Sequence, residues 1–84
     1  MVHCLLDDTI KVLNFAKENK KNLKNMYLNG DFETREEDTT ITLNNGYRIR
    51  IVNNEYITYY NLEKIDKKSY TDIEQVLLYI KSLF

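Results

Sequence analysis

The sequence contains no proline, two glycines, one cysteine and one histidine among its 84 residues. A single cysteine cannot form an internal disulfide, and a single histidine cannot build a histidine-based metal site without several carboxylates around it. Redox and zinc frameworks are therefore excluded, and we expect no cofactor. Only Gly30 and Gly46 adopt positive φ angles without strain, so we expect asparagines to occupy the turns.

Long hydrophobic runs are also lacking. No stretch approaches the roughly 18 apolar residues of a membrane span, and the first residues lack the basic segment that opens a secretory signal. The composition, 43% hydrophobic and 30% charged, is that of an ordinary globular protein. We therefore expect one domain over residues 1–84, located in the cytoplasm and not in a membrane.

The first part of the chain has helical periodicity. Apolar residues recur at steps of three and four positions and form one expected stripe, with polar residues on the opposite side. The stripe consists of Leu6, Ile10, Leu13, Ala16, Leu23, Met26 and Tyr27. Asn29 and Gly30 then provide residue types at which helices end. This pattern predicts a helix over about 7–28.

Alternation of apolar and polar residues then predicts strands at 40–43 and 47–52. A two-residue turn would set Ile41 opposite an arginine. A three-residue loop ending at Gly46 sets it opposite Ile49, so we expect the longer loop, with glycine in the left-handed conformation.

A turn at Asn53-Asn54 predicts a third strand over about 55–62, with Val52 opposite Glu55. This register separates the side chains of the sheet into two faces. The inner face is expected to hold Tyr47, Ile49, Ile51, Tyr56, Thr58, Tyr60 and Leu62. The outer face is expected to hold Arg48, Arg50, Ile57 and Tyr59.

A second helix is predicted over about 71–83, where Thr71 and Glu74 have the spacing of a capping box. The expected apolar stripe of this helix is Ile73, Val76, Leu77, Ile80 and Phe84. Residues 63–70 are expected to be a charged link, and residues 31–38 an acidic connection in which a short edge strand could form. The expected fold is α+β, a two-layer sandwich of a helix, a three- or four-stranded antiparallel meander and a C-terminal helix.

Charge is segregated along the chain. Residues 11–24 carry five lysines and one glutamate, whereas residues 31–38 carry five carboxylates and one arginine. Such an arrangement orients the protein as it approaches a charged partner. An acidic cluster can also occupy an arginine-lined groove of a partner that normally holds nucleic acid. The alternative interpretation is a solvated acidic loop. The carboxylates that could contact a partner are Asp31, Glu33, Glu36, Glu37 and Asp38.

The outer sheet face combines arginine with aromatic and aliphatic residues, a composition enriched at protein interfaces and at base-stacking platforms. Alternatively, the arginines only solvate an exposed face. A net charge of −1 favours a protein partner over a nucleic acid. The first hypothesis is therefore a non-enzymatic interaction protein that contacts a protein partner with the 31–38 loop and the adjoining sheet edge. The second hypothesis is a nucleic-acid-binding accessory protein, which would use Lys17, Lys20, Lys21 and Lys24 or Arg48, Arg50 and Tyr59.

No residue combination forms a catalytic signature. His3 and Cys4 are adjacent, but neighbouring residues on a helix or strand point away from one another, and no third residue orients them. The acidic residues lack the spacing of a calcium loop. We therefore expect a protein that is not an enzyme and that binds no metal.

The order helix, three-stranded meander, helix, with the segment RIRIVNNEYI at positions 48–57 making the central turn, resembles small phage-encoded anti-CRISPR proteins that plug the nucleic-acid site of a type II nuclease. The resemblance implies an inhibitor in the host-cell cytoplasm and a CRISPR nuclease or another nucleic-acid enzyme as the partner. It also implies contact through the carboxylates of residues 31–38.

The C-terminal helix suggests self-association. Leu78 and Tyr79 fall off the apolar stripe of this helix, and a domain of this size has difficulty burying them alone. A two-fold pairing of the helix with its copy would cover both residues. We therefore expect a homodimer through Leu78 and Tyr79; the alternative is that the N-terminal helix or another protein partner covers these residues.

Overall fold

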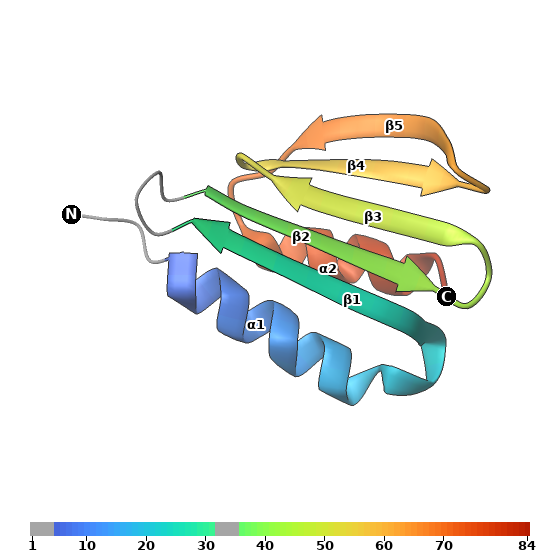
Figure 1. Ribbon diagram of the computed structural model, residues 1–84, viewed down its shortest axis with the longest axis horizontal. Helices are drawn as coiled ribbons and strands as arrows, with labels where there is room; N and C mark the ends of the chain where they lie inside the picture. Colours follow the sequence, from blue (N-terminus) through green and yellow to red (C-terminus); the bar gives the residue numbers. More distant parts are fainter. Residues whose placement is uncertain (1–4, 32–35) are drawn as a thin grey trace.

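The computed structural model describes residues 5–31 and 36–84, which form helices and strands in the order shown in Figure 1. The elements are α1 (Leu5–Glu18), the 3-10 helix η1 (Lys20–Asn22), β1 (Leu23–Asp31), β2 (Glu36–Leu43), β3 (Tyr47–Val52), β4 (Glu55–Tyr60), β5 (Glu63–Ser69) and α2 (Ile73–Ser82).

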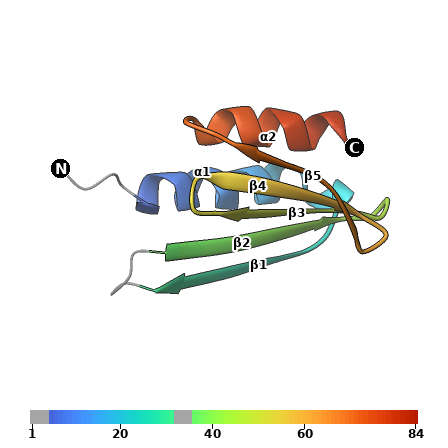
Figure 2. The same cartoon turned by 90° about the horizontal axis from the view of Figure 1, so that it is seen from above.

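The described strands form one antiparallel sheet in the order β1-β2-β3-β4-β5, a meander in which every neighbour in sequence is a neighbour in space. Side chains alternate between the two faces of such a sheet. Ile41, Ile49 and Ile51 share one face and form a single buried cluster with residues from both helices. Both helices therefore cover the same face, an arrangement that can be followed in Figures 1 and 2 together. The expected α+β class is confirmed, with five strands in the described residues.

The two central hairpins have the expected register. Ile41 pairs with Ile49 across the β2–β3 loop, and Val52 pairs with Glu55 across the β3–β4 turn. Gly46 has a φ of 99°, and a Cβ at this position would lie 3.0 Å from the side-chain oxygen of Asn61. The backbone conformation thus favours glycine here, and a Cβ would in addition displace the Asn61 side chain slightly.

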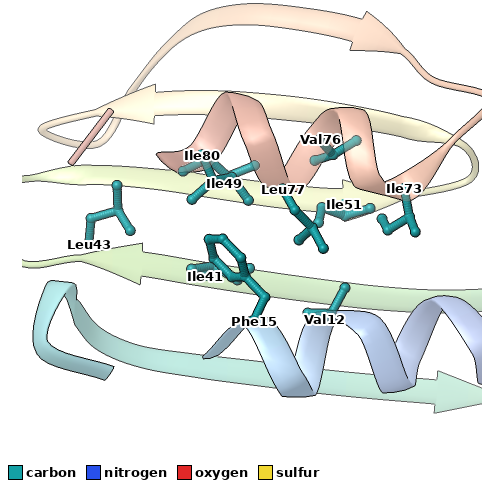
Figure 3. Packing of buried hydrophobic residues seen from close by; sticks show 10 residues of the cluster. All are labelled: Val12, Phe15, Ile41, Leu43, Ile49, Ile51, Ile73, Val76, Leu77 and Ile80. Carbon is teal, nitrogen blue, oxygen red and sulfur yellow. The ribbon is translucent and has the colours of Figure 1, made fainter. Parts of the chain in front are cut away.

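The core lies between the helices and the inner face of the sheet (Figure 3). Thr58 is fully buried there, and its hydroxyl group lies 2.9 Å from the hydroxyl of Tyr79. This hydrogen bond satisfies a polar group that would otherwise be buried without a partner. The apolar core residues are Val12, Phe15, Ile41, Leu43, Ile49, Ile51, Ile73, Val76, Leu77 and Ile80.

The prediction of one helix over 7–28 is wrong in its second half. The helix ends at Glu18, and the backbone and side-chain nitrogens of Asn19 both donate to the carbonyl of Phe15. Residues 23–31 form β1, in which Met26 lies opposite Ile41. Pairing with β2 provides hydrogen-bond partners for the backbone N–H and C=O groups of this segment. The free energy gained from this pairing outweighs the weak helical propensity of the segment.

The expected apolar stripe of α1 is also wrong. Val12 and Phe15 are buried, whereas Ile10 and Leu13 are 46% and 41% exposed. The buried face of α1 is therefore the one that carries Val12 and Phe15, which are three positions apart.

The charged segment 63–70 was expected to be a link, but it contains β5. Five of the seven residues of β5 are charged and the strand is largely exposed, which is typical of an edge strand protected against further pairing. Leu62, expected on the inner face, instead lies in the turn between β4 and β5, where it has a φ of 72° and is 78% exposed.

Helix α2 has most of the expected apolar stripe, with Ile73, Val76, Leu77 and Ile80 buried. Phe84, expected on the same stripe, lies beyond the end of the helix and is 41% exposed. The expected cap is wrong by one residue. Asp72 is the N-cap, and its carboxylate accepts a hydrogen bond from the backbone N–H of Glu74 at 3.0 Å. Aspartate is a better cap than threonine and also complements the helix dipole.

Candidate binding face on the open side of the sheet

The face of the sheet that the helices leave uncovered is the candidate binding site, which we call the open face (Figure 2). The cross-strand register decides which side chains share this face. Arg48 lies opposite Tyr59, and Arg50 lies opposite Ile57, as expected. By the same register the open face carries Tyr27, Thr40, Thr42, Arg48, Arg50, Ile57, Tyr59, Lys64 and Lys67.

One cross-strand row of the open face places a tyrosine between two basic residues in the strand register. Tyr59 of β4 pairs with Arg48 of β3 on one side and with Lys64 of β5 on the other. Arg48 and Lys64 are exposed, and neither forms an ion pair with another described residue. We call Arg48, Tyr59 and Lys64 the Tyr59 row. It offers two positive charges and an aromatic surface to a partner.

The other arginine of the open face is engaged within the protein. Arg50 donates two hydrogen bonds to Asp38, from Nε at 2.9 Å and from one terminal nitrogen at 2.7 Å. The hydrogen bonding and the positive charge of Arg50 lower the pKa of Asp38 despite its partial burial. This bidentate pair orients Arg50 and neutralises it.

The fold places the residues of the predicted acidic site in different surroundings. Asp38 is bound by Arg50, so its carboxylate is already satisfied. Asp31 ends β1 and pairs with Glu36, and Glu37 is the next residue of β2, so these positions lie at the β1–β2 hairpin. Glu33 lies outside the described residues, as do Phe32 and Thr34 of the expected edge strand.

The predicted lysine-rich helix face does not exist as such. Lys17 is in the last turn of α1, Lys20 and Lys21 are in η1, and Lys24 is in β1. These lysines lie where the chain enters β1. The β1–β2 hairpin, which carries Asp31, Glu36 and Glu37 and which we call the acidic hairpin, lies at the far end of the same strand (Figure 1). Nine residues of strand span about 30 Å, so the basic and acidic ends are well separated.

The two residues expected at a dimer contact lie differently. Leu78 is 67% exposed. Tyr79 turns to the sheet, where its ring centroid lies 5.3 Å from that of Tyr56 and its hydroxyl bonds to Thr58. Tyr79 is thus part of the packing between α2 and β4, not of an exposed patch.

Sequence reasoning missed the contributions of β1 and β5 to the open face. The helical periodicity over 7–28 includes Tyr27, and Lys64 and Lys67 fall in the segment 63–70 that the sequence predicts to be a link. The only sequence feature that could indicate a strand in 63–69 is the mixture of positive and negative charges. This feature is weak evidence, because only Ile65 in β5 is apolar.

His3 and Cys4 lie outside the described residues. No group of three or more potential metal ligands occurs in the described part of the chain. None of the helices in residues 5–31 and 36–84 is both long and apolar enough to cross a membrane. Comparison with protein-family models, with curated proteins and with solved structures finds no match for this chain.

Proposed function

We propose that this chain is a small non-enzymatic binding domain that docks a protein partner on its open face. The observation that carries the proposal is the Tyr59 row, in which Arg48 and Lys64 flank Tyr59 on a sheet face covered by neither helix. Arginine and tyrosine are enriched among the residues that contribute most to protein interfaces. Both residues lie on β3 and β4, strands that each pair with a neighbour on both sides.

Charge supports a protein partner over a nucleic acid. The cations Arg50 and Lys67 of the open face are paired with Asp38 and Glu55, at 2.7 and 3.6 Å. The face is therefore only moderately positive, and the chain as a whole has a net charge of −1. Mixed charge of this kind favours selective contact with a protein surface.

The test measures how tightly this protein binds a partner that has been isolated by affinity capture and then purified. Arg48→Glu and Tyr59→Ala should each weaken binding about 10-fold or more, as expected for central interface residues. Lys17→Glu is the matched control, since it reverses an exposed cation on α1 and should leave the affinity unchanged. Unchanged binding by both open-face variants would show that the partner docks elsewhere.

The acidic hairpin supports a more specific form of the proposal, inhibition of a nucleic-acid-handling enzyme. Carboxylates of the β1–β2 hairpin would enter a basic groove of that enzyme and replace phosphates. Changing Glu33, Glu36 and Glu37 to glutamine should then abolish inhibition of nucleic-acid cleavage by a purified CRISPR nuclease, while the fold is retained. If the triple variant inhibits as well as the wild type, charge mimicry is not the mechanism.

The Tyr59 row also supports a second candidate, binding of single-stranded nucleic acid, because bases stack on aromatic rings flanked by cations. Fluorescence anisotropy with labelled single-stranded DNA and RNA tests it. Two phosphate contacts, through Arg48 and Lys64, predict that log K falls with log salt at a slope of about −0.7 for each contact. Absence of binding at low salt rejects this candidate and leaves the protein-binding proposal intact.

A further inference from the structure

A groove of about 390 Å³ lies between α1 and α2, on the side of the molecule opposite the open face. Phe15 and Leu77 line it, and both are nearly buried, at 6% and 8% exposure. Figure 3 shows the two side chains reaching from their helices toward the shared core. Leu78 also lines the groove but is 67% exposed, so its apolar surface has no cover within the described chain.

The charged residues of the groove alternate in sign around its apolar centre. The two helices run in the same direction (Figures 1 and 2). Lys11 of α1 and Glu74 of α2 therefore flank one end, and Glu18 of α1 and Lys81 of α2 flank the other. Among the described residues, no ion pair joins the charges across either end.

This pattern is complementary to itself. A two-fold axis across the helices sets α2 antiparallel to α2 of a second copy. Glu74 then faces the partner's Lys81, and Lys11 faces the partner's Glu18. Opposite charges meet at every contact, which a surface for an unrelated partner has no reason to provide.

We propose that the groove is the interface of a homodimer in which Leu78 of each copy packs over the Phe15 and Leu77 floor of the other. Tyr79 takes no part, because it is held against the sheet. Both open faces stay accessible on the outside of the dimer, so the assembly can engage two partner sites at once.

Sedimentation velocity from low to high micromolar concentration measures the self-association of the full chain. The wild type should dimerise, and Leu78→Glu should weaken the dimer more than about 100-fold, because both copies lose a buried leucine. Leu62→Glu is the control, since it makes the same change at an exposed leucine of the β4–β5 turn. Circular dichroism establishes that each variant is folded.

A charge swap tests the antiparallel arrangement. Glu74→Lys and Lys81→Glu should each weaken the homodimer about 10-fold, because like charges then meet at two symmetric positions. Mixing the two variants restores opposite charges at both positions, so native mass spectrometry should detect a heterodimer. A monomeric wild type overturns the proposal, and so does a dimer that Leu78→Glu leaves intact or a mixture that forms no heterodimer.

Discussion

The hydroxyl groups of Thr58 and Tyr79 lie 2.9 Å apart and join β4 to α2 through one hydrogen bond. Thr58 has no exposed surface, whereas Tyr79 is half-buried and also packs on Tyr56. A polar group placed this deep is stable only while its partner stays in position. The bond therefore fixes how the C-terminal helix sits on the sheet.

Tyr79→Phe should lower the free energy of unfolding by about 1–2 kcal/mol, because the ring is kept while the Thr58 hydroxyl loses its partner. Adding Thr58→Val should recover part of this loss, since both hydroxyls are then replaced by apolar groups. Urea denaturation of the two single variants and the double variant gives the coupling energy. Additive effects would show that the two hydroxyls do not interact.

The Asp38–Arg50 pair makes stability depend on pH. Because the folded protein lowers the pKa of Asp38, the pair stabilises fully above the ordinary aspartate pKa of about 3.9 and less as the pH falls below it. Both side chains are partly exposed, at 33% and 42%, so the contribution should stay below about 1 kcal/mol. Denaturation of the wild type and of Asp38→Asn at a series of pH values from neutral to about 2 tests this. In the variant, the free energy of unfolding should fall less steeply over this range. An identical acid dependence in wild type and variant would contradict the prediction.

Leu62 has a strained backbone conformation, and its side chain is exposed, so burial of the side chain does not offset the strain. It has a φ of 72° and follows Asn61, whose φ is 49°, in a two-residue hairpin turn that asparagine-glycine suits best. Leu62→Gly should raise the free energy of unfolding by about 0.5–1 kcal/mol, because the left-handed conformation no longer clashes with a Cβ. Leu62→Ala keeps the Cβ and should have little effect. Thermal unfolding of the three proteins compares them directly, and equal gains from both variants would refute the strain argument.

The cap of α2 can be tested with two neighbouring residues. Asp72→Ala should lower the free energy of unfolding by about 1 kcal/mol, because the Glu74 backbone N–H loses its acceptor. Thr71 is exposed and lies outside the helix, so Thr71→Ala should leave stability within about 0.5 kcal/mol of the wild type. A larger loss from Thr71→Ala than from Asp72→Ala would reverse the assignment of the cap.

The sequence by itself determines the central hairpins. The partners Ile41 and Ile49 are eight positions apart, and the Asn53-Asn54 turn has the positive φ angles, 52° and 60°, expected from its residue types. Turn chemistry and alternation act over such short separations, so local information is sufficient. The same reasoning identified the buried stripe of α2 and placed Arg48, Arg50, Ile57 and Tyr59 on one face of the sheet.

Only the tertiary structure decided what happens at the two edges of the sheet. Residues 23–31 are a strand because Met26 and its neighbours meet β2, not because of any strong preference of their own. The charged β5 is a strand because it pairs with β4, which in turn brings Lys64 beside Tyr59. Pairing energy exists only once the partner strand is present, so the complete open face and the groove beside Leu78 could not be read from local patterns.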